Sequence, residues 1–524
     1  MTARDVRDLL LAPRLSRHEV LAWLARYGFR DPAQADRNLQ ALAEDPFDRA
    51  LLADVLDDLL FALGQSADPD GALGRLERFF RANGAPAPLL SHLKTAPRTT
   101  DVLARTLGAS PFFAEILIRH PQWLYWLSDP DVLARGRRRN EIEADVARAL
   151  APLRTEERQK DALRLARRRE ILHIGVRDLL RLASVEETLS ALTALAEVLV
   201  QKACDVAEAA LRHEYGLPPR RASGVQRGFT VLGLGKLGGA ELNFSSDVDL
   251  VFLCASDAGR LGRNASAPAR AEYHAALARR VTAALSDVTD NGYVYRVDLR
   301  LRPDGSHGSV VPSLRACEEY YRTRGATWER LALLKAWPVA GDRGLGRRFA
   351  AIVRPFVFAR PFDAAALEEI RALKRGIDRK VALRNESRRH VKLGIGGIRE
   401  IELVVQAFQV RFGGRRSEIR ERNTLRALAR LGRARLLTRA EREALAAAYV
   451  FLRDLENKLQ MVADAQTHSL PEDREELDAC ARRLGYRDAA GVDAPEALLR
   501  DYRAHTESTH RVFRDVFEGQ RLLA

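Results

Sequence analysis

Two aspartates separated by one residue form the densest chemical signal in the chain. Asp247 and Asp249 lie within an apolar run that is rich in strand-forming residues. On a strand, their side chains would share one face and lie about 6.6–6.8 Å apart. Paired carboxylates repel each other unless a cation lies between them, and oxygen ligands that leave room for water and phosphate suit Mg²⁺. The spacing therefore indicates a metal site, with a solvated strand face as the alternative interpretation.

A third carboxylate follows in residues 293–302, which alternate strictly between an apolar face and a charged face. The charged face holds Asp298 among arginines that include Arg300 and Arg302. A carboxylate among arginines is typical of a metal ligand beside phosphate-binding groups, but an exposed strand with internal ion pairs explains it equally well when it is taken alone. Beside the first two aspartates the site is favoured, because three such carboxylates suit phosphoryl transfer on metal ions.

A glycine-rich turn immediately precedes the aspartate pair and contains the pattern G-x-G-x-x-G at Gly233, Gly235 and Gly238. The pattern does not indicate a dinucleotide-binding fold, because the next strand follows too soon for a helical crossover. It is not a Walker A loop either, since Lys236 is followed by leucine and the glycine spacing differs. Backbone N–H groups of residues 233–239, at a helix N-terminus, would instead cradle phosphate. Ser245 and Ser246 would add hydrogen bonds or cap the turn.

The elements that must position these residues form an α+β pattern. Residues 1–215 have helical periodicity, including a helix over Val185–Tyr215 that Ser184 would cap and a helix behind Pro111 that Ser110 would cap. Three strands are predicted, at Phe229–Gly233, Val248–Cys254 and Tyr293–Leu301. Helical periodicity resumes near Ser313 and continues to the end. We expect four regions, divided at the Gly216–Pro219 break and elsewhere: 1–105, 106–218, 219–390 and 391–524.

The composition excludes several classes of protein. With 524 residues, 46% of them hydrophobic and 30% charged, the chain can bury a large core. Its four cysteines follow no metal or disulfide pattern, and no apolar run is long enough to span a membrane, so we expect a reduced cytoplasmic protein. The net charge of +14 permits nucleic-acid binding. Basic stretches such as 411–442 are interleaved with glutamate on helical patterns, however, which favours solvated helix faces over a specific nucleic-acid surface.

A glycine turn about a dozen residues before Asp-x-Asp resembles the polymerase-beta-like nucleotidyltransferase superfamily. One longer motif resembles the bifunctional glutamine synthetase adenylyltransferase/adenylyl-removing enzymes. It reads Gly-Lys-Leu-Gly-Gly-x-Glu-Leu-Asn-Phe-Ser-Ser-Asp-x-Asp-Leu. Further matches occur in order along the chain, from about Ser110 to near its end: Tyr295–Pro303, Trp328–Arg330, Lys335–Ala336, Arg354–Phe358, Lys392–Glu402, Arg453–Asn457 and Gln466–Pro471. The resemblance implies a mostly helical chain with an inserted polymerase-beta-like α/β unit and a C-terminal helical bundle.

The resemblance also implies an activity. That family has two nucleotidyltransferase copies, whereas this chain has one Gly-Lys turn and one Asp-x-Asp strand. Their sequence is similar to the copy that removes AMP from a glutamine synthetase tyrosine with phosphate and releases ADP. We therefore expect either a stand-alone half or a truncation, with glutamine synthetase as protein substrate. A nitrogen-signalling regulatory protein and a separately encoded adenylyltransferase half are further expected partners.

By the same resemblance, the site residues take defined roles. Asp247, Asp249 and Asp298 would hold Mg²⁺, and the residues expected to contact phosphate or nucleotide are Gly233, Gly235, Lys236, Gly238, Ser245, Ser246, Arg300 and Arg302. Four residues are weaker candidates for closing over the ADP or ATP: Lys335, Lys392, Arg399 and Glu402. One departure is Trp337, where the family leads us to expect an arginine.

Three other functions remain open from the sequence. The chain would be an adenylyltransferase that attaches AMP from ATP to glutamine synthetase if its site used ATP, and the sequence does not show which nucleotide the site uses. It would be a non-catalytic docking module if the site were inactive, but a pure scaffold has no reason to retain three mutually repelling aspartates. A nucleic-acid nucleotidyltransferase would suit the basic charge, but no recognisable nucleic-acid-binding motif is present.

Overall fold

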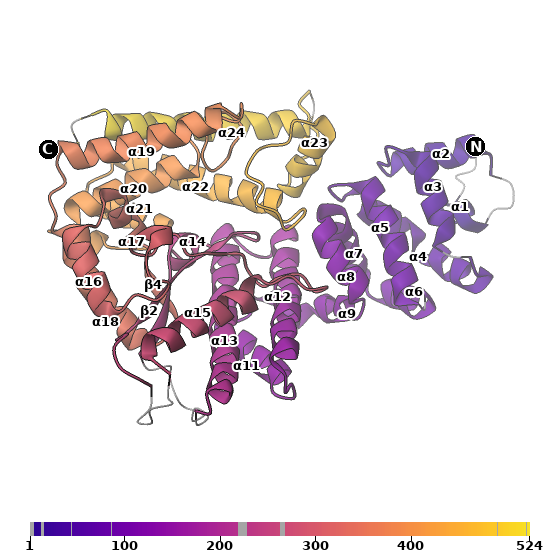
Figure 1. Cartoon of the computed structure of the whole chain (residues 1–524). Coiled ribbons are helices and arrows are strands. Elements are labelled where there is room, and N and C mark those ends of the chain that lie inside the picture. The colour runs from indigo at the N-terminus through magenta and orange to yellow at the C-terminus, as the bar shows by residue number, and fades with distance from the viewer. Residues whose placement is uncertain are drawn as a thin grey trace. The chain divides into compact units, whose positions relative to one another are not determined.

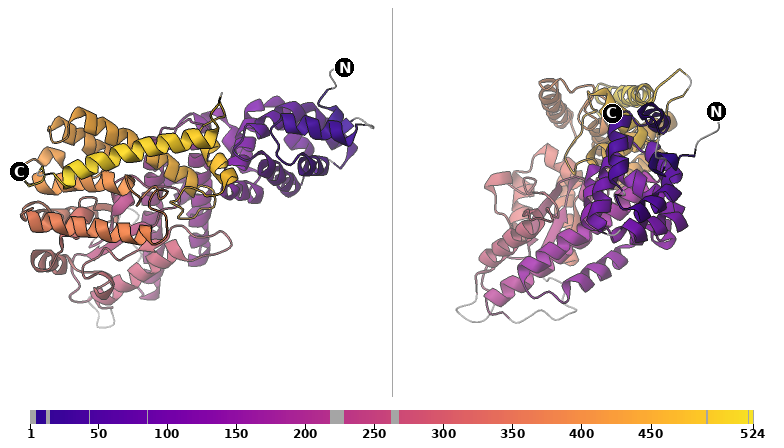
Figure 2. Two further views of the ribbon diagram at one scale, coloured as in Figure 1. Left: turned by 90° about the horizontal axis from the view of Figure 1, so that it is seen from above. Right: turned by 90° about the vertical axis from the view of Figure 1, so that its right-hand side faces the viewer.

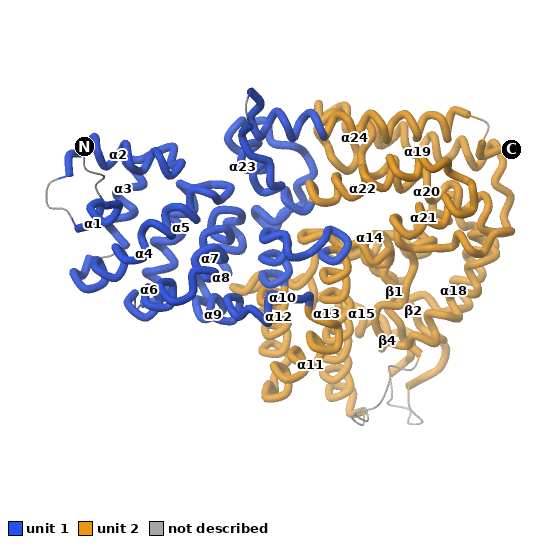
Figure 3. Tube along the Cα trace, turned by 180° about the vertical axis from the view of Figure 1, so that it is seen from behind, with its two compact units in different colours: residues 1–136, 171–188, 457–501 blue, residues 137–170, 189–456, 502–524 orange. Residues whose placement is uncertain are grey.

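The computed structural model describes residues 5–11, 15–42, 44–84, 86–217, 228–261, 268–489, 491–519 and 521–523. It is mostly helical with one small sheet (Figure 1), which confirms the predicted α+β class. The chain forms two compact units (Figure 3): residues 1–136, 171–188 and 457–501, and residues 137–170, 189–456 and 502–524. The predicted break at Gly216–Pro219 runs into residues 218–227, which lie outside the described residues, and the four-region division stays a prediction. No described helix is both long and apolar enough to cross a membrane.

The first unit is helical. Its helices are α1 (Asp8–Leu11), α2 (Arg17–Arg26), α3 (Pro32–Ala41), α4 (Pro46–Gly64), α5 (Pro69–Asn83), α6 (Pro86–Thr95), α7 (Pro97–Ala109), α8 (Pro111–Arg119), α9 (Trp123–Ser128), α10 (Pro130–Ala134) and α23 (Arg474–Arg483). Many begin with proline behind a capping side chain, because proline at the first helical position lacks only an N–H that would have no helical partner. Ser110 caps α8 as predicted, its Oγ accepting from the N–H of Phe113 at 3.0 Å.

Four long helices are shared between the two units: α12 (Glu156–Leu179), α13 (Val185–Glu214), α22 (Arg439–Gln460) and α24 (Ala494–Phe517). The start of α13 confirms the predicted cap. Ser184 Oγ accepts from the N–H of Glu187 at 3.2 Å, and the N–H of Ser184 donates to the Glu187 carboxylate at 2.7 Å. This reciprocal pair satisfies two N–H groups that have no partner within the helix.

The second unit contains the sheet and the remaining helices. These are α11 (Arg139–Leu150), α14 (Gly235–Gly238), α15 (Arg270–Ser286), α16 (Leu314–Thr323), α17 (Thr327–Leu333), α18 (Arg343–Phe358), α19 (Ala364–Ala382), α20 (Ile398–Phe412) and α21 (Thr424–Arg433), with 3-10 turns at Gly305–His307 and Ser417–Ile419. Helices α19 to α22 gather with the C-terminal part of α24 (Figures 1 and 2). The Arg371 side chain on α19 donates to the backbone carbonyl of Phe517 on α24 at 3.0 Å, which joins the two helices.

The sheet has the order β3-β2-β1-β4, with β1 at Phe229–Gly233, β2 at Val248–Cys254, β3 at Val297–Asp298 and β4 at Trp337–Gly341. Strand β1 is antiparallel to β2 and β4, whereas β2 and β3 are parallel. The register pairs Gly233 with both Leu250 and Trp337, and Asp249 with Asp298. The glycine turn and two of the three aspartates therefore lie at the same end of the sheet.

Two strand predictions need correction. The predicted strand Tyr293–Leu301 pairs only over Val297–Asp298. Before it, the N–H groups of Val294 and Tyr295 both donate to the carbonyl of Leu285 at the end of α15, and after it the N–H of Arg300 folds back onto Asp298 Oδ1 at 2.8 Å. Both contacts divert the backbone from the ladder.

The second correction is β4, which lies where helical periodicity was expected to continue beyond Ser313. Helix α16 does begin there, with Ser313 as its cap. Residues Trp337–Gly341 nevertheless form an edge strand on β1. Pro338 is tolerated because proline is found on edge strands, where a missing ladder hydrogen bond costs least.

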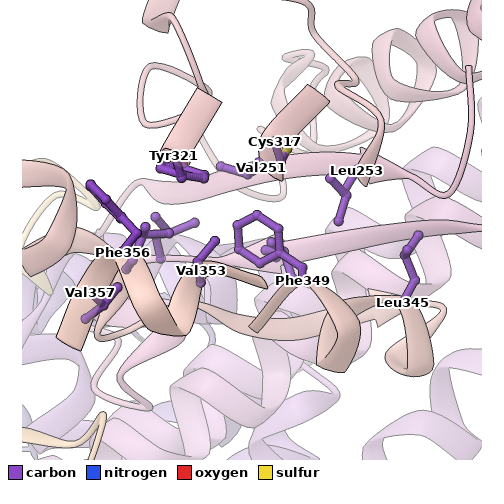
Figure 4. Close-up of a cluster of buried hydrophobic side chains, with 12 residues drawn as sticks. Val251, Leu253, Cys317, Tyr321, Leu345, Phe349, Val353, Phe356 and Val357 are labelled. Carbon is purple, nitrogen blue, oxygen red and sulfur yellow. The ribbon is translucent and has the colours of Figure 1, made fainter. Parts of the chain in front are cut away.

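The core of this unit lies on one face of the sheet, beneath α16 and α18. Figure 4 shows Val251 and Leu253 of β2 packed with Phe349, Val353 and other side chains of these helices. On the alternate residues of β2, the ring of Phe252 stacks on Phe229 with centroids 5.9 Å apart. Both faces of β2 are thus buried beyond Asp249, which explains why the strand is so uniformly apolar.

Candidate active site

The carboxylates of Asp249 and Asp298 come from paired positions on neighbouring parallel strands. Asp249 is half-buried and accepts no hydrogen bond on its side chain from the described residues. Burial, and then the negative charges of Asp298 and Asp247, raise the pKa of Asp249 to about 6, while Lys392 and Lys236 oppose that shift. The structure therefore concentrates negative charge at one end of the sheet.

The glycine turn wraps around Asp249. The N–H of Leu234 donates to the backbone carbonyl of Asp249 at 2.9 Å. Gly235 has a φ of +53°, and a Cβ at this position would lie 2.3 Å from Asp249 Oδ2. Glycine is required here both for the left-handed backbone and for the close approach of the carboxylate. The helix that follows, α14, has only four residues, so the predicted helix N-terminus is a single turn.

We expect Gly235→Ala to reduce activity by about a hundredfold, because a shift of about an ångström at reacting groups costs that much. The added methyl group would displace the Asp249 carboxylate. Gly259→Ala is the matched control, since Gly259 has a φ of +77° but a Cβ added there would meet nothing within 4 Å. Steady-state kinetics of both variants would check this; equal losses would mean that backbone strain alone is responsible.

Asp247 precedes β2 and is held by an arginine. Arg296 Nε lies 2.7 Å from Asp247 Oδ1, and Arg296 Nη2 donates to the Ser245 carbonyl at 2.7 Å and to Ser245 Oγ at 3.1 Å. Ser245 therefore has a role in shaping the turn. The hydroxyl of Ser246 is buried without a hydrogen-bond partner among the described residues, so it can still serve a ligand. Arg296 was predicted only as a flanking residue of the charged face.

The two arginines predicted to bind phosphate differ in position. Arg300 is largely exposed, and its Nη2 lies 2.5 Å from Asp298 Oδ2. Hydrogen bonding from the Arg300 side chain lowers the pKa of Asp298, against the effect of burial. Arg302 instead donates to the backbone carbonyls of Leu299, Ser306 and Gly308 at 2.8–3.4 Å. Arg302 thus stabilises the loop after β3 and forms no hydrogen bond with the three predicted metal-binding aspartates.

Two of the predicted lysines lie near Asp249, but only one is unpaired. Lys236 Nζ is 2.7 Å from Oε1 of Glu456, a fully buried residue on α22, and burial lowers the pKa of Lys236 to about 7. Lys392 is half-buried, and its side chain forms no hydrogen bond or ion pair with any described residue. Its charge acts on both Asp249 and Lys236. Lys392 is therefore the cation that remains available to an incoming anion.

Lys335 and Glu402 form a buried ion cluster with Glu241. Lys335 Nζ lies 2.8 Å from Glu402 Oε1 and 3.0 Å from Glu241 Oε2. Tyr449 Oη donates to the same Glu241 oxygen at 2.9 Å, and Thr424 Oγ1 donates to it at 3.2 Å. Glu402 lies on α20, which is buried on nearly all sides. Glu241 was missed, although it stands within the glycine-turn motif.

Arg399 lies at the margin of this cluster. Its Nη1 is 3.4 Å from Glu402 Oε2, and its side chain is partly exposed. Burial alone would raise the pKa of Glu402, but the charges of Lys335 and Arg399 lower it well below its ordinary value. Ionised Glu402 is thus stabilised by the fold.

This depression predicts acid sensitivity. A carboxylate whose pKa is lower in the folded state stabilises the fold above its unfolded pKa of 4.5, and that stabilisation is lost as the pH falls. We expect the free energy of unfolding to fall between pH 5 and pH 3 more steeply in the wild type than in Glu402→Gln, as measured by urea titration at each pH. Parallel curves would contradict the assignment.

Trp337, where an arginine was expected, supports an arginine from another segment. The guanidinium of Arg422 lies 4.1 Å from the Trp337 ring centroid, and Arg422 Nη1 donates to the carbonyl of Gly238 at 2.6 Å. Trp337 remains 43% exposed. Trp337 therefore packs against Arg422, which contacts the end of α14.

The donor set fits a divalent cation that prefers oxygen, such as Mg²⁺. Three aspartates at one end of the sheet supply only carboxylate oxygens, and Asp249 is ionised with difficulty beside two like charges. Among the described side chains as they lie, no three His, Cys, Asp or Glu residues are grouped to hold a metal. Arg296 and Arg300 form ion pairs with Asp247 and Asp298. Metal binding would have to compete with those two arginines.

The family follows from comparison with known proteins. A family model described as glutamate-ammonia ligase adenylyltransferase matches residues 100–352, which include the sheet and the glycine turn. A second model, described as GlnD PII-uridylyltransferase, matches residues 371–517. Residues 100–352 therefore form a domain of the glutamate-ammonia ligase adenylyltransferase family.

Among curated relatives, proteins named bifunctional glutamine synthetase adenylyltransferase/adenylyl-removing enzyme are similar to most of the chain. Those of Nitrosococcus oceani and Thioalkalivibrio sulfidiphilus are each 39% identical, over 78% and 80% of this chain. That of Methylococcus capsulatus is 40% identical over 66% of it. The matches span 42%, 42% and 36% of these relatives, so the chain corresponds to about two fifths of their length.

Proposed function

We propose that the chain removes AMP from adenylylated glutamine synthetase by phosphorolysis, consuming phosphate and releasing ADP. The observation that supports this most is the pairing of Asp249 with Asp298 beside a glycine turn that encloses the Asp249 carboxylate. Relatives of the chain are named for both adenylyl transfer and adenylyl removal on glutamine synthetase. A separate adenylyltransferase half and a nitrogen-signalling protein are proposed as further partners.

The residues of the site would then divide the work of binding and positioning. Backbone N–H groups of the glycine turn and the Ser246 hydroxyl would bind the adenylyl phosphate. Lys392 would bind the incoming phosphate, because of the two lysines near Asp249 it is the one whose side chain has no partner among the described residues. Asp247, Asp249 and Asp298 would hold Mg²⁺, which when bound neutralises charge on the phosphoryl group. Such chemistry depends mainly on positioning and electrostatic stabilisation, which a preorganised site supplies.

Lys392→Ala should raise KM for phosphate by about tenfold, a loss of ~1.4 kcal/mol that suits one charge-assisted contact. The cause would be the loss of the cation that faces the anion. Lys380→Ala is the matched control, since Lys380 is an exposed lysine on α19. Initial rates at varied phosphate concentration check this, and an unchanged KM in Lys392→Ala would reject the role.

The direction of the reaction can be read from the protein substrate itself. Adenylylated glutamine synthetase is incubated with the chain, phosphate and Mg²⁺, and unmodified synthetase with the chain, ATP and Mg²⁺. Intact-protein mass spectrometry then shows whether the synthetase subunit loses or gains an adenylyl group. We expect loss in the first mixture and no change in the second. Gain in the second mixture alone would mean that the chain runs the forward reaction.

A further inference from the structure

A cavity of about 360 Å³ lies in the second unit between α19, the start of α20, α24 and the loop before α20. Its volume is at the lower end of the roughly 300–1,000 Å³ range of small-molecule sites. Much of the wall is apolar and includes Val381, Leu393 and Phe513. Asp247, Asp249, Asp298 and the glycine turn do not line it, so this cavity is separate from the candidate active site.

The polar floor of the cavity consists of charged groups that already contact one another. Lys374 Nζ lies 2.9 Å from Glu400 Oε1 and 2.5 Å from Asp378 Oδ1. Glu400 Oε2 lies 3.0 Å from His510 Nδ1, and Glu400 is almost completely buried. Lys374 already has two carboxylate partners, so an anionic ligand gains little by bonding to its ammonium group. Glu400 Oε1 accepts no hydrogen bond among the described residues.

Two other polar groups at the cavity are uncommitted. The guanidinium of Arg379 has no carboxylate partner among the described residues, and the hydroxyl of half-buried Ser387 donates and accepts no hydrogen bond there. Three exposed basic residues lie near this region in sequence, namely Lys380, Arg384 and Arg388. A positively charged surrounding raises the local concentration of anions. From the apolar walls, the unpaired arginine and this charge, we propose that the cavity binds a small organic anion with an apolar body.

The cavity shares a loop with the candidate active site. Leu393, Gly394 and Ile395 line the cavity, while the preceding residue, Lys392, places its charge near Asp249. Backbone hydrogen bonds cross the loop, including one from the N–H of Ile395 to the carbonyl of Ser387 at 3.0 Å. An occupant of the cavity would therefore contact the loop that presents Lys392. This consequence rests on the proposed function, whereas binding itself does not.

Octanoate is the probe for binding, and 1-octanol is its uncharged counterpart. We expect isothermal titration calorimetry on the whole chain to show octanoate binding at least tenfold tighter than octanol. Ala382→Trp, which fills the cavity from its exposed rim, should abolish octanoate binding, and Arg379→Glu should weaken it at least tenfold. Lys380→Glu makes the same charge change on the same helix but outside the cavity, so it should weaken octanoate binding by a smaller factor than Arg379→Glu does.

The outcomes distinguish binding at the cavity from an effect of that binding on ADP release. Absent octanoate binding, equal binding of octanol, or unchanged binding in Ala382→Trp would each overturn the proposal. If octanoate binds as expected, it should change the initial rate of ADP release in the wild type but not in Ala382→Trp. A chain that binds octanoate but releases no ADP under any condition would retain the cavity site and reject the proposed function.

Discussion

Asp249→Asn should abolish ADP release, lowering the rate by roughly a thousandfold or more, because under the proposed function it removes a ligand of the Mg²⁺ that would stabilise the phosphoryl transfer. The same variant should be more stable than the wild type in Mg²⁺-free buffer, by about 2 kcal/mol, since the ionised carboxylate is disfavoured by burial and by its two like-charged neighbours. The variant is expected to be more stable because the pKa of Asp249 is raised in the folded state. Ionised Asp249 therefore destabilises the fold at neutral pH, and a neutral side chain removes that destabilisation. Rates are measured by ADP release and stability by urea titration.

These opposite effects distinguish a functional carboxylate from a structural one. Asp257→Asn is the control, because Asp257 is an exposed aspartate just beyond β2 and should leave both quantities unchanged. A variant at Asp249 that lost both activity and stability would indicate that the carboxylate holds the fold together. Full activity in Asp249→Asn would remove Asp249 from the reaction.

Lys335→Met should destabilise the fold by about 3–5 kcal/mol, because removal of one partner leaves buried charges uncompensated. Glu241 and Glu402 are both at most about 9% exposed on their side chains, and each lies within 3.0 Å of the Lys335 ammonium. The loss would reach activity indirectly, since Glu241 follows the glycine turn and its N–H donates to the carbonyl of Lys236 at 2.8 Å. The midpoint of urea unfolding is the measurement.

A neutral version of the whole cluster tests the cause. The triple variant Lys335→Met, Glu241→Gln, Glu402→Gln should recover at least half of the lost stability, since an ion cluster replaced by uncharged groups of similar shape is often nearly neutral. Lys380→Met, at an exposed lysine, should cost less than about 0.5 kcal/mol. If the triple variant were no more stable than Lys335→Met, lost packing and not charge would explain the effect.

The local parts of the fold could be predicted from the sequence. Strands β1 and β2 have the bounds that their apolar, β-branched runs indicate, and Ser110 and Ser184 cap helices at the predicted positions. The local sequence pattern was misleading where the pairing of strands decides which residues belong to the sheet. Residues 293–301 alternate along their whole length, but the hydrogen bonds to Leu285 and Asp298 leave only two residues in the ladder.

The candidate site was predictable as a set of residues and not as a set of contacts. Alternation placed Asp298 among arginines, but only the sheet register shows that it pairs with Asp249. Lys335 contacts Glu241 and Glu402 across 94 and 67 positions of sequence, and no local pattern reveals that their charges meet. The same holds for Lys236 and Glu456, whose pairing leaves Lys392 as the unpaired lysine beside Asp249.

The most direct test of the account is the fate of labelled inorganic phosphate. The purified chain is incubated with adenylylated glutamine synthetase, Mg²⁺ and [³²P]phosphate, and the nucleotides are separated. We predict that label appears in the β-phosphate of ADP, that chelation of the metal prevents this, and that Asp249→Asn shows none. Release of unlabelled AMP, or labelled ADP formed equally well by Asp249→Asn, would contradict phosphorolysis at this site.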